Sequence, residues 1–251
     1  MSYFAPNIPL EKHCFFDRHG GVSKDIYDSL NMSICSQDKR DNVLQNLNIA
    51  AHYYAKDLSN LNIIKQGTSN KAIYITTPER YKTFADGAVT NQKNIILAVR
   101  TADCAPILFY DKEHQVIGIA HAGWRGALRG IIENTLDLML SHGATKQDIA
   151  AAIGPCLQKQ SFACQADMLQ EFLTYDKEYE NFFTPADKTH WLFDAQNFCI
   201  NRLKKYGINN ISSSDINTYT DENYFSYRRN CHRNLVSAPF DYPTHLSTIM
   251  L

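Results

Sequence analysis

The chain has 251 residues, 44% of them hydrophobic, and its 25 lysines and arginines nearly balance its 26 aspartates and glutamates. A chain of this length can bury enough apolar surface to fold without disulfide or metal cross-links. Its net charge of -1 argues against disorder and against a protein that coats nucleic acid or an anionic membrane. We therefore expect one domain over residues 1–251 and no nucleic-acid or membrane partner.

Neither a membrane span nor a secretory signal is expected. Even the longest apolar runs, such as residues 95–99, are much shorter than the roughly 20 residues that a transmembrane helix needs. The first residues show no basic start before an apolar stretch. The seven cysteines are scattered and never spaced C-x-x-C, which excludes a disulfide framework and a zinc finger. A reduced cytoplasmic enzyme is the simplest prediction.

Strand and helix patterns mix along the chain. Six segments rich in apolar residues predict strands, at residues 14–16, 71–77, 94–101, 106–110, 115–121 and 149–153. Helices are predicted at residues 165–175, at residues 194–206 before Gly207, and through residues 128–139 before Gly143. The order is not a clean βαβ alternation, which predicts an α/β or α+β fold and not a doubly wound sheet.

The segment Thr101-Ala102-Asp103-Cys104 directly follows a predicted buried strand. Open α/β sheets place reactive groups at strand ends, so Asp103 and Cys104 would emerge at a rim. A free cysteine is more often a small buried hydrophobic residue, and spacing alone favours that interpretation. Cys156, after the strand at residues 149–153, has the same two interpretations.

His121 ends another predicted strand and opens the segment His121-Ala122-Gly123-Trp124-Arg125-Gly126. A helix N-terminus beside an arginine favours an anion, the glycines let a ligand approach the backbone, and Trp124 can stack on a flat ring. The alternative is a tight strand-to-helix turn with a core tryptophan. Three such side chains in one turn favour a functional site.

Cys104 and His121 end successive strands, so they can meet in space. Such a pair serves either as a thiolate nucleophile with its base, or as two ligands of a zinc or copper ion that needs at least a third protein ligand. Three outer segments add candidates: Arg18 beside Gly20-Gly21, Asp86 at a predicted Asp-Gly turn, and the run Ser226-Tyr227-Arg228-Arg229, which is a solvated face or a substrate wall.

In this order, the segments RHGGVS, ADGAVT, TADCAPILFYD, HAGWRG, AIGPC and SYRR resemble the YfiH-like laccase-domain family, also called the multicopper polyphenol oxidase-type family. The resemblance runs from Arg18 to Arg229. It implies an α/β (α+β) fold, a single-domain sandwich of mixed β-sheets flanked by helices. It also implies a His/Cys/His cluster that holds zinc or copper, in which Cys104 and His121 match the cysteine and the second histidine.

The first histidine of that cluster is expected where this chain has Thr68, and no other histidine lies between His52 and His114. A threonine hydroxyl is a poor zinc ligand beside an imidazole and a thiolate, so this departure bears on metal affinity and on activity. A multicopper oxidase needs many histidines, usually in H-x-H pairs. This chain has nine histidines and no such pair, which argues against laccase chemistry.

The resemblance instead implies purine nucleoside chemistry, with nucleosides and phosphate as the partners: phosphorolysis of adenosine, inosine and methylthioadenosine, and deamination of adenosine. The residues expected to bind substrate are Arg18, Asp86, Trp124 and Arg125. The two arginines would hold phosphate, the tryptophan would stack on the purine, and the carboxylate would orient a hydroxyl or accept a proton. A metal-bound water at Cys104 and His121 would attack the base for deamination.

Two other functions are compatible with the same residues. One is a metal-free cysteine hydrolase that uses Cys104 and His121. The other is a degenerate, non-catalytic family member, because Thr68 replaces the expected ligand histidine. The sequence indicates no protein partner.

Overall fold

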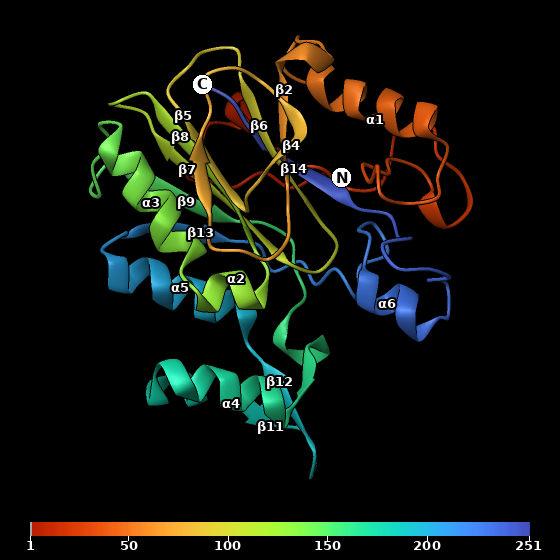
Figure 1. The fold of residues 1–251 in the computed structure, drawn as a ribbon, viewed down its shortest axis with the longest axis vertical. Coiled ribbons are helices and arrows are strands. Elements are labelled where there is room, and N and C mark those ends of the chain that lie inside the picture. Colours follow the sequence, from red (N-terminus) through yellow and green to blue (C-terminus); the bar gives the residue numbers. More distant parts are fainter. Residues whose placement is uncertain (1) are drawn as a thin grey trace.

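The computed structural model describes residues 2–251 and contains two β-sheets packed face to face, with helices on both outer faces (Figure 1). The five-stranded sheet has the order β1 (His13–Phe15), β14 (His245–Ile249), β6 (Ile96–Thr101), β2 (Leu61–Lys65) and β4 (Arg80–Phe84). The six-stranded sheet has the order β13 (Asn210–Ser213), β9 (Ile149–Ile153), β7 (Ala105–Asp111), β8 (Val116–Ala122), β5 (Gly87–Thr90) and β3 (Ala72–Tyr74). Both sheets contain parallel and antiparallel pairs, which confirms the predicted sandwich of mixed sheets.

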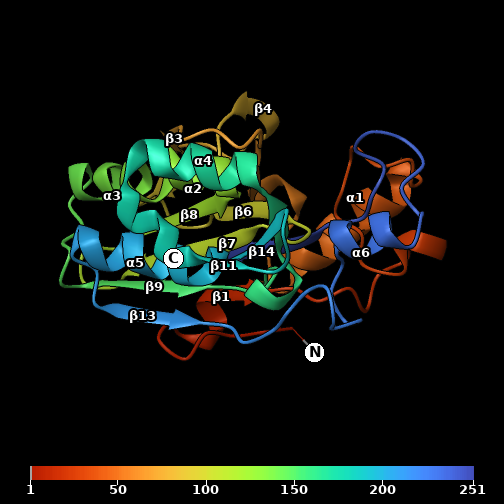
Figure 2. The ribbon, with the colours of Figure 1, turned by 90° about the horizontal axis from the view of Figure 1, so that it is seen from below.

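The helices divide between the two outer faces. The helix α1 (Arg40–His52) covers the five-stranded sheet. The other sheet is covered by α2 (Trp124–Leu128), α3 (Ile131–Ser141), α4 (Ala166–Tyr175) and α5 (Ala195–Tyr206), and α4 carries a small sheet of β10 (Ala163–Gln165), β12 (His190–Phe193) and β11 (Phe183–Pro185). The last helix, α6 (Tyr227–His232), lies on the same side of the molecule as α1 (Figure 2), but well below it along the long axis in Figure 1. None of the helices between residues 2 and 251 has the length and apolar character that crossing a membrane requires.

Apolar side chains leave both faces of each sheet, so the core has three layers. Val99 of β6 and Leu108 of β7 pack between the sheets. Phe109, the next residue of β7, packs toward the helices on the six-stranded sheet, and Ala98 of β6 packs toward α1. Every residue of β7 and β8 is buried. Strands that are covered on both faces consist of continuous apolar residues, and this pattern is why the sequence predicts the central strands.

The predicted central elements are confirmed. The strands expected at residues 94–101, 106–110, 115–121 and 149–153 correspond to β6, β7, β8 and β9, and the two later helices correspond to α4 and α5. Asp194 caps the start of α5 through a side-chain bond to the Asn197 N–H, and Gly207 ends it with a φ of 102°. The strand expected at residues 71–77 is shorter, as β3.

Two local predictions are wrong. The helix expected through residues 128–139 is two helices, because Gly130 takes a φ of 97° between α2 and α3. The turn expected at Asp86-Gly87 is the start of the buried strand β5, because Gly87 pairs with Ala120 of β8. A Cβ atom on Gly87 would meet the Thr135 hydroxyl at 2.4 Å, so this glycine serves close packing of α3 and not a turn.

The buried imidazole of His245 links this fold to pH. His245 is 1% exposed, and its Nε2 lies 3.0 Å from the Thr101 hydroxyl. Its Nδ1 has no hydrogen-bond partner among the described residues. Burial lowers the pKa of His245 to about 3, with Asp17 opposing and Arg229 adding to the shift. The unfolded chain therefore binds a proton in a pH range where the folded chain does not.

We expect the free energy of unfolding to fall as the pH drops from about 6.5 toward 3, with His245 contributing up to about 1.4 kcal/mol per pH unit. His245→Gln removes this contribution, whereas Thr101→Val lowers stability but keeps the slope. Urea unfolding of the three proteins between about pH 6.5 and pH 4 measures the slopes. Equal slopes in the native chain and in His245→Gln would contradict the prediction.

Candidate active site

Cys104 and His121 lie side by side at the open end of the β7–β8 hairpin. The antiparallel register pairs Ala105 with Ala122, so the residue before β7 and the end of β8 reach the same place. A Cβ atom built on Gly123 would lie 3.4 Å from Cys104 Sγ and 3.5 Å from His121 Cε1. Cys104 is partly exposed, and His121 is 7% exposed. The structure thus brings the predicted thiol and imidazole together, with the cysteine open to solvent.

Asp86 fixes the orientation of His121. Its Oδ1 lies 2.7 Å from His121 Nδ1, and the carboxylate is fully buried. The same carboxylate accepts the backbone N–H groups of Gly67, Thr68 and Ser69, at 2.7 to 3.2 Å, and the Ser69 hydroxyl at 2.6 Å. These donors occupy both oxygens, so Asp86 holds the imidazole and the loop at residues 67–69 and has no free oxygen for a substrate hydroxyl.

Neighbouring charges and hydrogen bonds shift the pKa values of His121 and Asp86 against the effect of burial. Burial alone would lower the pKa of His121, but the charge of Cys104, the hydrogen bonds to Asp86 and Cys104, and the Asp86 carboxylate together raise it to about 10. Burial alone would raise the pKa of Asp86, but the hydrogen bond and charge of His121 and the bonds from Ser69 lower it. Because Nδ1 is bound to Asp86, the other ring nitrogen, Nε2, is the one available to Cys104.

Thr68 occupies the third corner of this site. Its Cγ2 would lie 3.2 Å from a Cβ atom on Gly123, next to the positions of Cys104 and His121. Its hydroxyl donates to the Gly67 carbonyl at 2.7 Å. Its backbone has a φ of 57°, a region that β-branched residues rarely adopt and that histidine adopts more often. The position expected to carry a ligand histidine therefore carries a methyl group and an occupied hydroxyl.

This donor set does not complete a zinc or copper site. Cys104 and His121 supply two ligand atoms, whereas catalytic zinc sites use three protein ligands. Among residues 2–251, the one group of three His, Cys, Asp or Glu side chains with ligand atoms within 4.8 Å of one another is Asp111, His114 and Asp148. We therefore derive no chemical step from a metal ion.

The Asp111 group lies at the other end of the β7–β8 hairpin, away from Cys104. Asp111 is fully buried and accepts the backbone N–H groups of His114 and Thr145, each at 2.9 Å, and lies 2.9 Å from His114 Nδ1. Asp148 accepts the Thr145 hydroxyl at 2.6 Å. These bonds tie two loops together and account for the cluster without an ion.

Asp103 connects the cysteine to the C-terminal part of the chain. Its carboxylate accepts the Thr218 hydroxyl and the Arg228 N–H, both at 2.7 Å, and its carbonyl accepts the Leu157 N–H at 2.8 Å. Its φ is 90°, which aspartate tolerates better than most residues. The residue beside Cys104 thus anchors the turn instead of facing a substrate.

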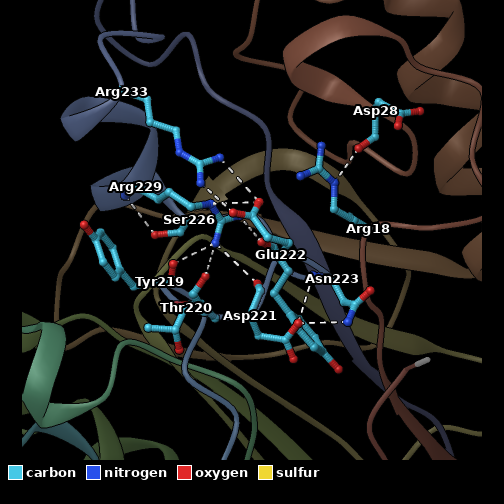
Figure 3. Close-up of polar contacts among 12 residues, drawn as sticks. Arg18, Asp28, Tyr219, Thr220, Asp221, Glu222, Asn223, Ser226, Arg229 and Arg233 are labelled. Carbon is cyan, nitrogen blue, oxygen red and sulfur yellow. Dashed lines mark hydrogen bonds and ion pairs between the residues drawn. The ribbon is translucent and has the colours of Figure 1, made fainter.

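The basic run at residues 226–229 is partly a structural anchor, although Tyr227 stays exposed. Ser226 caps α6, and Arg228 donates to the Ala163 carbonyl at 2.8 Å. Arg229 is 4% exposed and donates to the carbonyls of Thr218, Tyr219, Asp221 and Tyr224 (Figure 3).

Arg18 lies beside this anchor. Its Nε donates to the Asp28 carbonyl at 2.5 Å, and its guanidinium lies 4.7 Å from the centroid of the Phe225 ring. Burial and the nearby Arg229 lower the pKa of Arg18, with Asp28 and Glu222 opposing. Within residues 2–251, none of its hydrogen-bond partners belongs to the Cys104–His121 pair.

Trp124 and Arg125 contact each other. The guanidinium of Arg125 lies 4.0 Å from the Trp124 ring centroid, and the indole stacks on Phe172 with centroids 6.0 Å apart. Arg125 is exposed, whereas Trp124 is half-buried.

Cys156 is fully buried, which agrees with the interpretation that it is a core residue.

Sequence reasoning missed Tyr242 and Arg100 as neighbours of the site. Burial raises the pKa of Tyr242; the charge of Cys104 adds to the shift and Arg100 opposes it. Tyr242 comes from a loop far along the chain, and Arg100 looked like a polar position within a buried strand. The tripeptide Arg100-Thr101-Ala102 next to Asp103-Cys104 was the available signal.

Comparisons with known proteins identify the family of this chain. A family model described as multi-copper polyphenol oxidoreductase laccase matches residues 12–235. A purine nucleoside phosphorylase of Rickettsia prowazekii is 32% identical over 225 residues, which are 86% of this chain and 88% of the relative. The purine nucleoside phosphorylase YfiH of Escherichia coli K12 is 32% identical over 219 residues, 86% of this chain and 87% of the relative.

Solved structures give the same result. The hypothetical protein YfiH of Bacillus licheniformis superimposes with a TM-score of 0.87 at 26% identity, covering 95% of this chain and 92% of that chain. A Neisseria meningitidis protein of the family DUF152 gives a TM-score of 0.85 at 25% identity, covering 100% and 98%. The family match over most of the chain and relatives above 30% identity confirm the resemblance seen in the sequence motifs. The chain belongs to the YfiH-type multi-copper polyphenol oxidoreductase laccase family.

Proposed function

We propose that this protein is a purine nucleoside phosphorylase that converts adenosine, inosine and methylthioadenosine to the free base and ribose 1-phosphate at Cys104 and His121. The observation that carries the proposal is the proximity of a partly exposed cysteine to a buried imidazole that a carboxylate orients. The names of the relatives from Rickettsia prowazekii and Escherichia coli give independent support.

The proposed reaction needs a proton donor. An oxygen of phosphate forms a bond to C1′ of the ribose while the bond from C1′ to the purine nitrogen breaks, and the base leaves with the electron pair and takes up a proton. We assign this proton to the Cys104–His121 pair, since Cys104 and Asp86 raise the pKa of His121 against the effect of burial. Asp86 acts through His121 as a positioning residue.

The other predicted contacts stay predictions. Of the four residues expected to bind substrate, Asp86 is bonded to His121 and the loop at residues 67–69, and Arg18, Trp124 and Arg125 remain expected substrate contacts. Arg125 and part of Trp124 are exposed. Zinc or copper at Cys104 and His121 is the cofactor that the family suggests, and it needs a ligand that Thr68 does not supply. The seven cysteines are all free, which supports the predicted cytoplasmic location.

Adenosine deamination is the second activity proposed for the same site. In that reaction a water oxygen forms a bond to C6 of the adenine ring, and ammonia leaves.

A metal-free cysteine hydrolase is the alternative function. The thiol of Cys104, the imidazole of His121 and the carboxylate of Asp86 follow one another in the order that such an enzyme uses. If the protein is inactive with every substrate, it is a degenerate, non-catalytic member of the family.

The first test is an assay of adenosine and inosine with and without phosphate. We expect ribose 1-phosphate to form only when phosphate is present, and Cys104→Ala and His121→Asn to lower kcat/KM by about 100-fold or more. Cys164→Ala, which changes a cysteine in the small sheet, is the matched control and should keep full activity. Release of ammonia from adenosine would establish deamination, and absence of both products would overturn the proposed function.

The Asp86 carboxylate should contribute strongly to stability. Asp86→Asn replaces an acceptor with an amide N–H₂ that faces the donors of the loop at residues 67–69, so we expect a loss of about 3 kcal/mol and a lower kcat with a similar KM for inosine. Asp187→Asn alters an exposed carboxylate that also accepts backbone N–H groups, and should lower stability much less than Asp86→Asn. Urea unfolding measures both; equal losses would contradict the role given to Asp86.

Restoring a histidine at position 68 tests the metal. We expect the native chain to carry less than stoichiometric zinc and Thr68→His to bind zinc at one per chain, because three protein ligands then surround one point. The positive φ of residue 68 suits histidine, so the variant should unfold at a similar urea concentration. Metal analysis by mass spectrometry gives the answer. Native protein with one zinc that Cys104→Ala removes would contradict the two-ligand assignment.

A further inference from the structure

Arg100 of β6 has a side-chain nitrogen without a hydrogen-bond partner among the described residues. Gln66 holds its backbone on both sides, through the Arg100 N–H at 2.8 Å and the Arg100 carbonyl at 2.7 Å. No ion pair among residues 2–251 includes Arg100, and its Nε is buried without a hydrogen-bond partner. A buried donor without an acceptor is costly, so such a position favours binding of an acceptor from outside the chain.

A second unpartnered donor lies against the same guanidinium. The Arg100 guanidinium carbon lies 5.0 Å from the centroid of the Tyr81 ring, and the Tyr81 hydroxyl is also buried without a partner. The charged groups that act on the pKa of Tyr81 are Arg100, Arg80 and Cys35, and no carboxylate of the described chain is among them. Two unused donors and two arginines make this side of the site attractive to an anion.

The Arg100 position belongs to the candidate active site. Arg100 lies four residues before Cys104, and Gln66 continues into the loop at residues 67–69 that Asp86 holds next to His121. Thr68 of that loop lies beside Cys104 and His121, since all three approach one point next to Gly123. The Arg100 backbone, which Gln66 holds, is therefore one short loop away from the thiol and imidazole.

We propose that Arg100, together with the Tyr81 hydroxyl, binds a phosphate group beside Cys104. This assignment deepens the proposed function, on which it rests, by placing the phosphate on Arg100 instead of Arg125 or Arg18. A guanidinium offers paired donors that match two phosphate oxygens, and a phenol adds a third donor. Arg125 differs because its exposed guanidinium already lies on Trp124, and Arg18 differs because its Nε is bound to the Asp28 carbonyl. The phosphate is either the free co-substrate or the 5′-phosphate of a nucleotide.

The test is calorimetric titration of the full chain with inorganic phosphate and, separately, with adenosine 5′-monophosphate. Arg100→Gln should weaken binding by about 10- to 100-fold, and Arg100→Lys should weaken it less. Tyr81→Phe removes a hydroxyl that has no partner, so it should fold normally and weaken binding by about 3- to 10-fold. Arg129→Gln is the matched control, since Arg129 is an exposed arginine that pairs with Glu171 on the helix side, and should bind phosphate like the native chain.

The outcomes separate this inference from the proposed function. Binding of inorganic phosphate that depends on Arg100 and Tyr81 establishes the co-substrate site, even if no nucleoside is cleaved. Binding of the nucleotide alone, with the same dependence, assigns the site to a substrate phosphate. Binding of neither anion, or unchanged binding in Arg100→Gln and Tyr81→Phe, overturns the inference. Phosphate-dependent cleavage of inosine with an unchanged KM for phosphate in Arg100→Gln overturns it as well and leaves the proposed function intact.

Discussion

The hydrogen bond between Asp86 and His121 is the interaction on which the site depends. A fully buried carboxylate is stable only when it accepts several hydrogen bonds. The two oxygens of the buried Asp86 side chain accept bonds from His121 and from the loop at residues 67–69 at once. The loop cannot move away without leaving a buried charge unsatisfied. The relative positions of Cys104, His121 and residue 68 are therefore fixed by a side chain that no substrate can reach, which is the arrangement expected of a positioning group.

The two sheets explain why these side chains meet where they do. His121 ends β8, Cys104 lies in the connection from β6 to β7, and Asp86 immediately precedes β5, so three neighbouring strand ends supply the group. Asp103 then ties this edge to the C-terminal part of the chain through Thr218 and Arg228. Strands buried on both faces are rigid, and a site built at their ends inherits that rigidity while Cys104 stays accessible to solvent.

The sequence predicted the parts of this protein whose signals are local. The strands β6 to β9 are apolar on both faces, and α5 has a capping aspartate and a terminal glycine, so their patterns are strong. Strands such as β4 and β13 are short and polar, and only pairing with distant partners makes them strands. The same reason hid the true role of Asp86: Gly87 pairs with Ala120 across the sheet, and no local pattern shows that this places the carboxylate on His121. The Cys104–His121 contact was accessible because both residues end successive strands of one hairpin.

Residue 68 shows how this site can lose a ligand and keep its frame. Threonine rarely adopts a positive φ, so its φ of 57° is imposed by the surrounding bonds, above all by the acceptance of its N–H by Asp86. The loop geometry thus does not depend on which side chain stands at position 68. What remains is an imidazole whose pKa the Cys104 charge and the Asp86 carboxylate raise against the effect of burial, beside a partly exposed cysteine. Thr68 supplies no third ligand for a metal ion, and for that reason we assign the proposed chemistry to side chains and phosphate.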